Sequence, residues 1–251
     1  TRWLESTDSS VRAGDVIVGA AASGLHANGF SLVRSLISEW DLDLRRPYQE
    51  QLRRSLGDAA TDQAMAAEPE HELATLGEVL LTPTRIYARA ILRLREALQA
   101  AGSDIGGLAH VTGGGLPGNV PRALPTGLGA RLDPSRWPMP SVMRLVGALA
   151  GMDDAEVRGT FNGGLGMVVV VPPAAADLAI ATLAADGVPA LLAGQVVTAD
   201  EPAGLRYAEG PLACAGGSGW ASRVRARTCG RLSRPRGGAS SAERWSSSSA
   251  I

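Results

Sequence analysis

The chain contains 251 residues, with a formal net charge of −1 and 45% hydrophobic residues, a balance that is ordinary for a globular protein. All 24 basic residues are arginine, which excludes a Walker A lysine, a Schiff-base lysine and a lysine general base. The two cysteines, Cys214 and Cys229, lie near the C-terminus, so the main body has neither a cysteine zinc site nor a cysteine nucleophile. No apolar run reaches the roughly 18 residues of a membrane helix, and no membrane is expected as a partner.

Charge and composition divide the chain at residue 212. Residues 212–251 hold seven arginines against one acidic residue, with nine serines and six glycines, and apolar periodicity stops there. This composition predicts a disordered basic tail, and out-of-frame translation of a GC-rich gene is an alternative origin for it. A basic tail can bind nucleic acid, but a solvated tail is the simpler interpretation, so nucleic acid is not the expected partner. Residues 1–12 are interpreted as a linker in a fragment or processed chain, which leaves 13–211 as the folded domain.

The folded domain is predicted to alternate between strands and helices. In chain order, the patterns indicate a strand at 15–20, helices at 30–40 and 87–102, a strand at 108–112, a helix at 142–149, a strand at 167–171, a helix at 176–186 and a strand at 191–197. Residues 41–75 are weakly patterned and predict a long excursion with one short helix. This order of elements predicts a single α/β or α+β domain, with helices packed on a sheet.

The first candidate site segment, residues 23–31, joins the first expected strand to the first expected helix. Its small residues let the backbone approach a ligand closely, and a helix start offers unpaired N–H groups to an anion. An ordinary turn with Asn28 as the helix N-cap is an equally simple alternative. The candidate ligand contacts here are Ser23, Gly24, His26, Asn28, Gly29 and Ser31.

The second segment, residues 82–87, has the sequence TPTRIY. Thr82 is a suitable N-cap and Pro83 suits the first helical position, which places Arg85 in the first turn. The helix dipole disfavours a cation there, so Arg85 makes better sense if it meets an anion. A surface ion pair with an acid such as Glu78 is the alternative.

Two further segments are rich in glycine. Residues 110–117, HVTGGGLP, place three glycines between a strand and a helix, where backbone N–H groups of Gly113, Gly114 and Gly115 could hold phosphate. Residues 160–167, TFNGGLGM, lead into the central strand. For the three glycines a turn is the more common explanation, and for residues 160–167 a tight turn or a bulge is the alternative. The three histidines lack metal-ligand spacing, so no metal site is expected in this chain.

Taken together, these segments resemble the phosphoribosylformylglycinamidine cyclo-ligases, or AIR synthetases, of purine biosynthesis. TPTRIY followed by HVTGGG is the most specific match, and further matching stretches are Gly14-Asp15-Val16, residues 23–34, Asn119-Val120-Pro121-Arg122 and Thr160-Phe161-Asn162. Ala27 stands where serine is common in the family, and Gly163 replaces a larger residue. The resemblance covers about residues 10–210 and implies the C-terminal domain of the family, with an α+β fold in which helices pack on a mixed β-sheet.

The resemblance implies an ATP-dependent ring closure on a small ribonucleotide substrate. The formyl amide oxygen of formylglycinamidine ribonucleotide would be activated by phosphoryl transfer, after which a neighbouring nitrogen attacks and phosphate leaves. ATP and Mg²⁺ would bind mainly in the family's N-terminal domain, which has no counterpart here and would also form a homodimer in the full-length protein. The enzyme would be cytoplasmic, and this chain alone would be inactive.

The resemblance also implies roles for individual residues. His26, as a proton carrier, and Asn28 would act at the reacting end of the substrate. Asn162 would line the cleft that faces the absent domain. The remaining candidates would hold substrate or nucleotide phosphates: Ser23, Gly24, Gly29, Ser31, Thr82, Arg85, Thr112, Gly113, Gly114, Gly115 and Asn119. The alternatives are another ATP-dependent enzyme of the same superfamily, or a non-catalytic half-domain that binds a ligand and whose basic tail binds acidic partners.

Overall fold

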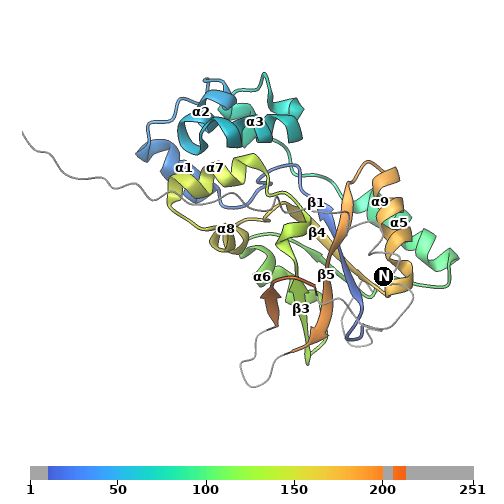
Figure 1. Cartoon of the computed structure of the whole chain (residues 1–251). Coiled ribbons are helices and arrows are strands. Elements are labelled where there is room, and N and C mark those ends of the chain that lie inside the picture. Colours follow the sequence, from blue (N-terminus) through green and yellow to red (C-terminus); the bar gives the residue numbers. More distant parts are fainter. Residues whose placement is uncertain (1–10, 200–205, 213–251) are drawn as a thin grey trace, which may run out of the picture. The chain divides into compact units, whose positions relative to one another are not determined.

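A six-stranded β-sheet forms the centre of the fold (Figure 1). The structure is a computed structural model, and it describes residues 11–199 and 206–212; the rest of the predicted linker and tail lies outside these ranges. The strands lie side by side in the order β2-β4-β1-β5-β3-β6. Their bounds are β1 (Val16–Ala21), β2 (Gly107–His110), β3 (Leu128–Leu132), β4 (Leu165–Val171), β5 (Ala190–Thr198) and β6 (Tyr207–Glu209).

The sheet is mixed, as predicted. The central strand β1 runs antiparallel to β4 on one side and to β5 on the other, so that Val16 faces both Val171 and Gln195. β2 is antiparallel to β4, β3 is antiparallel to β5, and β6 is parallel to β3. The four predicted strands are confirmed. β3 and β6 were not predicted, because five and three residues show too little alternation to be recognised.

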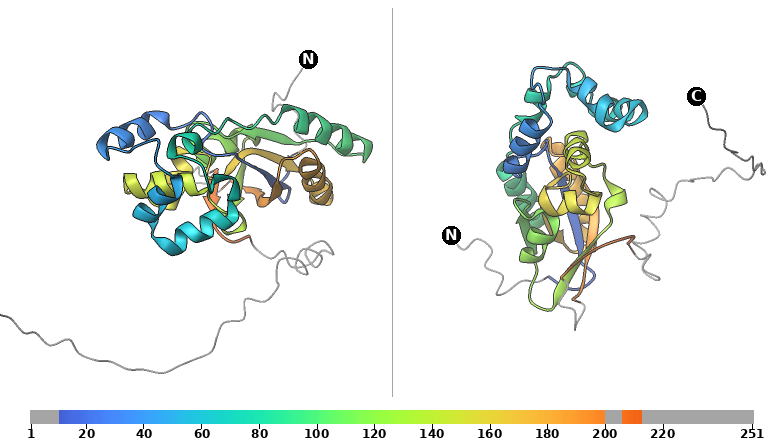
Figure 2. Two further views of the ribbon diagram at one scale, coloured as in Figure 1. Left: turned by 90° about the horizontal axis from the view of Figure 1, so that it is seen from above. Right: turned by 90° about the vertical axis from the view of Figure 1, so that its left-hand side faces the viewer.

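Two long helices pack against each other and cover one face of the sheet (Figure 2). These are α5 (Ala88–Ala100) and α9 (Ala176–Ala185), which also contacts β1 and β5. The opposite face buries apolar side chains such as Ile17 and Val170 against α6 (Gly115–Asn119) and the 3₁₀ helix η3 (Val120–Ala123). Because side chains alternate along a strand, the β-branched run of β4 supplies valines to both layers.

The remaining helices form a second apolar core of their own. In chain order they are α1 (Phe30–Glu39), α2 (Tyr48–Leu56), α3 (Asp58–Ala67), α4 (Leu76–Leu80), α7 (Ser141–Ala150) and α8 (Asp154–Thr160), with short 3₁₀ turns η2 (Pro69–His71), η4 (Pro134–Arg136) and η5 (Pro173–Ala175) elsewhere. Tyr48 and Phe161 are the largest of the side chains that this core buries completely. Among the described residues, no helix is both long and apolar enough to cross a membrane.

The excursion at residues 41–75 is more helical than predicted. It contains α2, α3 and η2, where one short helix was expected. α2 and α3 contain few large apolar residues, yet Tyr48, Leu52 and Ala64 are buried against α7 and its neighbours, so burial of a few side chains stabilises helices that periodicity hardly shows.

Two short helices, α4 and α8, were also absent from the prediction. Each begins with a capping box, formed by Thr75 with Glu78 in α4 and by Asp153 with Glu156 in α8. In a capping box the two side chains satisfy backbone N–H groups that the first turn leaves without partners. The spacing of these residue pairs is therefore a signal in the sequence that could have revealed both helices.

A buried polar cluster ties the excursion to α7. The Glu68 carboxylate accepts hydrogen bonds from the backbone N–H and the hydroxyl of Ser141 and contacts the His71 ring at 3.0 Å. The Tyr48 hydroxyl lies 2.8 Å from the Ser141 oxygen. Burial would raise the pKa of Glu68, but the hydrogen bonds from His71 and Ser141 outweigh it and lower the pKa. The Glu68 carboxylate in turn raises the pKa of His71.

Candidate functional site

The topology brings three of the candidate segments to one edge of the sheet. β1 runs antiparallel to β4, and so does β2, with Ala21 facing Leu165 and His110 facing Met167. The C-terminal ends of β1 and β2 therefore lie beside the N-terminal end of β4. Consequently residues 22–29, residues 111–115 and residues 161–164, which adjoin those three ends, are neighbours.

Side-chain hydrogen bonds join these segments to one another and to residues 82–87. The Ser23 hydroxyl donates to the Pro83 carbonyl at 2.7 Å. The Asn162 amide donates to the Gly24 carbonyl at 2.9 Å. The Asn28 amide lies 3.5 Å from the Val111 carbonyl. All four candidate segments thus belong to a single connected cluster.

His26 occupies the centre of the first segment in a left-handed backbone conformation, with φ of 57°. Such a conformation is uncommon for a non-glycine residue and is found where the surrounding structure enforces it. The imidazole is 3% exposed, and its Nε2 accepts a hydrogen bond from the Ser23 backbone N–H at 3.1 Å. The proton of the neutral ring is therefore on Nδ1, which is buried and has no partner among the described residues.

Burial lowers the pKa of His26 to about 4, with smaller contributions from the charges of His110 and Arg85. The ring is consequently neutral at physiological pH. This argues against the predicted role of His26 as a proton carrier, because Nε2 is already an acceptor and the ring resists a second proton. The arrangement instead makes Nδ1–H a hydrogen-bond donor.

Asn28 does not cap the first helix, which corrects the alternative interpretation of this segment. The residue before α1 is Gly29, with φ of 70°, and the helix start has no side-chain cap. A side chain at Gly29 would collide with the ring of Phe161, so glycine is required there for space as well as for backbone conformation. Asn28 is half-buried, and Ser31 is exposed on the first turn of α1.

The second segment is not the start of a helix, contrary to the prediction. Residues 82–87 form a non-helical stretch, and α5 begins at Ala88. Thr82 is therefore not the N-cap; it lies next to Gly24, where an added Cβ atom would be 3.5 Å from the Thr82 Cβ. The residue before a proline is disfavoured in the helical region, and the hydrogen bond from Ser23 to Pro83 holds the stretch against the first segment.

Arg85 is consequently outside the first turn, and the dipole argument for an anion does not apply to it. Its Nη1 donates to the Gly187 carbonyl at 2.8 Å, while its Nε is buried and has no hydrogen-bond partner among the described residues. Pairing with Glu78 is not observed, because that carboxylate belongs to the capping box of Thr75. An unpartnered buried N–H is a better argument for an anionic ligand than the predicted helix position.

Tyr87 is a central residue of the site, although it was not among the predicted site residues and only its segment, 82–87, was a candidate. Its ring is close to those of His26 and His110, with centroid distances of 6.1 and 6.2 Å. Its hydroxyl donates to the Ala21 carbonyl at 2.8 Å, and burial raises the pKa of the phenol. Gly166 leaves the space for this packing, since a Cβ atom there would overlap both Tyr87 and His26.

The glycine loop is held from the inside by Asn119. The Asn119 amide donates to the carbonyls of Thr112, Gly113 and Gly115 at 3.2, 3.2 and 2.7 Å, and its oxygen accepts from the Thr112 hydroxyl at 3.1 Å. Asn119 is buried, so it positions the loop and has no exposed surface for a ligand. Gly113 and Gly114 are exposed, and α6 follows the loop as predicted.

Asn162 is fully buried, so the expectation that it lines a cleft is wrong. Besides the bond to Gly24, its amide contacts the Leu25 carbonyl at 3.4 Å, and its oxygen accepts from the Gly164 N–H at 2.9 Å. Its hydrogen-bonding groups are used within the chain. Asn162 therefore supports the segment that carries His26.

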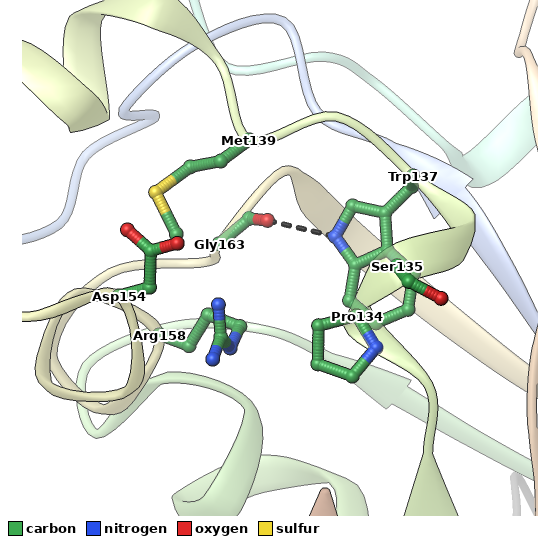
Figure 3. A pocket seen from close by; sticks show the side chains of 7 residues that line it. All are labelled: Pro134, Ser135, Trp137, Met139, Asp154, Arg158 and Gly163. Atoms are coloured by element: carbon green, nitrogen blue, oxygen red, sulfur yellow. Dashed lines mark hydrogen bonds between the residues drawn. The ribbon is translucent and has the colours of Figure 1, made fainter. Parts of the chain in front are cut away.

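A cavity of about 300 Å³ lies behind the fourth segment (Figure 3). The Trp137 indole N–H donates to the Gly163 carbonyl at 2.9 Å in its wall. The side chains of Met139, Asp154 and Arg158 also line it, and Arg158 makes a bidentate ion pair with Glu209. No sequence pattern indicates this cavity, because its walls come from η4, α8 and the turn at Gly163. In the part of the chain that the structure describes, no group of three or more metal-ligating side chains is found.

The comparison with known proteins identifies relatives. The family model "AIR synthase related protein, C-terminal domain" matches residues 12–205. A phosphoribosylformylglycinamidine cyclo-ligase of Sorangium cellulosum is 44% identical over 188 residues, which cover 75% of this chain and 47% of that protein. One from Gloeobacter violaceus is 43% identical over 198 residues, covering 79% and 50%. The chain thus spans about half the length of these curated relatives.

Among solved structures, similarity is lower. Thiamine-monophosphate kinase from Stenotrophomonas maltophilia is 18% identical, with a TM-score of 0.47 over 79% of this chain and 50% of that chain. HypE, a hydrogenase maturation protein of E. coli, is 21% identical, with a TM-score of 0.42 over 88% of this chain and 55% of that chain.

Proposed function

The chain belongs to the AIR synthase related protein family through the C-terminal domain of that family, and from this membership we propose that it is part of a phosphoribosylformylglycinamidine cyclo-ligase. In this proposal the enzyme converts formylglycinamidine ribonucleotide to aminoimidazole ribonucleotide in purine biosynthesis, with ATP as the phosphoryl donor. The identity of 44% to a curated cyclo-ligase supports the assignment. Because the chain spans about half the length of such relatives, the reaction is assigned to a whole enzyme of that length.

One observation carries the proposal: the site contains two buried N–H donors that have no partner among the described residues. They are Nδ1 of His26 and Nε of Arg85. An unpaired buried donor costs about 1–3 kcal/mol, so a ligand that supplies acceptor oxygens would gain from satisfying both. A ribonucleotide has such oxygens on its phosphate, its ribose and its amide groups.

In this proposal different residues of the chain bind different parts of the ribonucleotide. Arg85 and the backbone N–H groups of the exposed residues Gly113 and Gly114 would hold a phosphate, with the Thr112 hydroxyl beside them. His26 would donate through Nδ1–H to a substrate oxygen, and the Asn28 amide would orient the reacting end. Ser23, Gly24, Gly29, Ser31 and Thr82 would shape the remaining wall. The gain from such positioning is that the reacting nitrogen and carbon are held close together.

ATP and Mg²⁺ would bind mainly outside this chain, in the half of the relatives that it does not match. A bound metal would neutralise charge on the transferring phosphoryl group. Residues 1–251 alone are therefore expected to bind ribonucleotide without turnover, and formation of aminoimidazole ribonucleotide by the purified chain with ATP and Mg²⁺ would contradict this. A homodimer of the whole enzyme and a cytoplasmic location belong to the same proposal.

The binding proposal can be tested by isothermal titration of the chain with aminoimidazole ribonucleotide. Arg85→Gln should weaken binding about tenfold or more, because it removes a charged donor that faces phosphate. Arg89→Gln makes the same charge change at an exposed position on α5, where Arg89 contacts Asp186 at 3.6 Å, and should leave the affinity within about twofold. Equal weakening by both variants, or no binding by the unmodified chain, would count against the proposed function.

A further inference from the structure

The chain contains three histidines, and the structure gives them different capacities for proton transfer. His71 belongs to the buried cluster with Glu68 at 3.0 Å and lies outside the candidate site segments. His26 lies in the site, but its Nε2 accepts a hydrogen bond from Ser23 and its Nδ1 already carries the proton of the neutral ring. Neither ring can easily receive a proton from a bound ligand.

His110 differs from both. It is the last residue of β2, fixed by its pairing with Met167, and it directly precedes the loop that contains Thr112. Its side chain is exposed, and its ring contacts Tyr87 edge-on, with centroids 6.2 Å apart. No residue in the described ranges forms a hydrogen bond with either ring nitrogen of His110.

Tyr87 connects His110 to His26 at almost equal distances from both, so the two imidazoles share one site. Arg85 is the other charged group that acts on this site, because its charge also lowers the pKa of His26. The charge of His110 itself contributes to the lowered pKa of His26. Burial is the main reason that His26 stays neutral, so the two rings can have separate functions.

We propose that His110, and not His26, accepts the proton that the ring closure releases. This inference rests on the proposed function. In the step, the attacking amidine nitrogen forms a bond to the activated formyl carbon. The bond from that carbon to the phosphorylated oxygen breaks, and phosphate leaves with the electron pair. The proton of the attacking nitrogen passes to a free ring nitrogen of His110, while His26 keeps its proton and donates a hydrogen bond.

The test uses ¹⁵N spectra of the imidazoles in the complete chain, with single His→Gln variants to assign the three rings. Between about pH 5.5 and 8.5, His26 should remain neutral with its proton on Nδ1. Aminoimidazole ribonucleotide should shift the ring ¹⁵N signals of His110. His71 is the control, and its signals should not respond to the ribonucleotide.

Affinity measurements complete the test. His110→Gln should change the pH dependence of ribonucleotide binding over this range, and the part that remains belongs to the ribonucleotide phosphate, whose second pKa is about 6. His26→Gln should weaken binding about tenfold and leave the pH dependence intact. The inference is overturned if His26 titrates near neutral pH, or if the ribonucleotide binds and leaves His110 unaffected. A complete lack of ribonucleotide binding would instead overturn the proposed function, and this inference with it.

Discussion

Replacement of Asn162 by alanine should destabilise the chain strongly, although the residue touches no solvent. The side chain is 0% exposed and makes two hydrogen bonds of 2.9 Å, to the Gly24 carbonyl and from the Gly164 N–H. Both backbone groups are buried and would lose their partner. At about 1–3 kcal/mol for each unsatisfied group, the free energy of unfolding should fall by about 2–6 kcal/mol. Urea unfolding, followed by the fluorescence of tryptophans that include buried Trp137, would measure this change.

Asn28→Ala is the matched control, since it makes the same chemical change at a half-buried position. Asn28 makes one long contact of 3.5 Å with the Val111 carbonyl, so its loss should cost less than about 1 kcal/mol. If the two variants lose similar stability, or if Asn162→Ala loses less than about 1 kcal/mol, then Asn162 does not hold the segment as we infer.

Two further substitutions test other contacts. For His71→Ala, the loss of stability should be larger at about pH 5.5 than at about pH 8.5. The pKa of His71 is raised in the folded chain, so the contact with Glu68 adds stability below the ordinary histidine pKa of 6.5. That added stability is lost as the pH rises through the folded-state pKa of His71. The lowered pKa of Glu68 adds stability above pH 4.5, so the pair contributes most between about pH 4.5 and 6.5. Urea unfolding of His71→Ala and of the unmodified chain at both pH values would measure the two losses of stability. Equal losses would contradict the ion pair. Gly166→Ala should lower the free energy of unfolding by about 1–3 kcal/mol, because the added methyl group overlaps Tyr87 and His26 and must displace their rings. A ¹⁵N spectrum of His26 like that of the unmodified chain would show that the His26 ring is not displaced and would refute this reasoning.

Local patterns were sufficient for the strands and helices that carry most of the core. The run at 167–171 has β-branched residues at consecutive positions, and α5 and α7 show an apolar face, so burial and periodicity agree with the final structure. The prediction for residues 41–75 was wrong because their apolar periodicity is weak. Their helices are stabilised by a few buried contacts, such as Tyr48 with Ser141 on α7, which are 93 positions apart in the chain.

In the site, too, local patterns predicted one part and contacts between distant segments determined the rest. The order of its motifs made His26, Asn28, Arg85 and the glycine loop candidates, and the structure places their segments together. Sequence could not assign what each side chain does, because that depends on contacts between distant segments. The hydrogen bond from Asn162 crosses 138 positions to reach Gly24, and that from Arg85 crosses 102 to reach Gly187.

The sequence by itself determined the family, the α+β class and the segments in which the chemistry lies, because these depend on local residue order and periodicity. Only the tertiary structure decided which polar groups are buried and which of them remain free. Burial makes His26 a neutral donor with one fixed tautomer, leaves His110 exposed and turns Asn162 inward. These differences arise from antiparallel pairing of strands far apart in the chain, which no local pattern records.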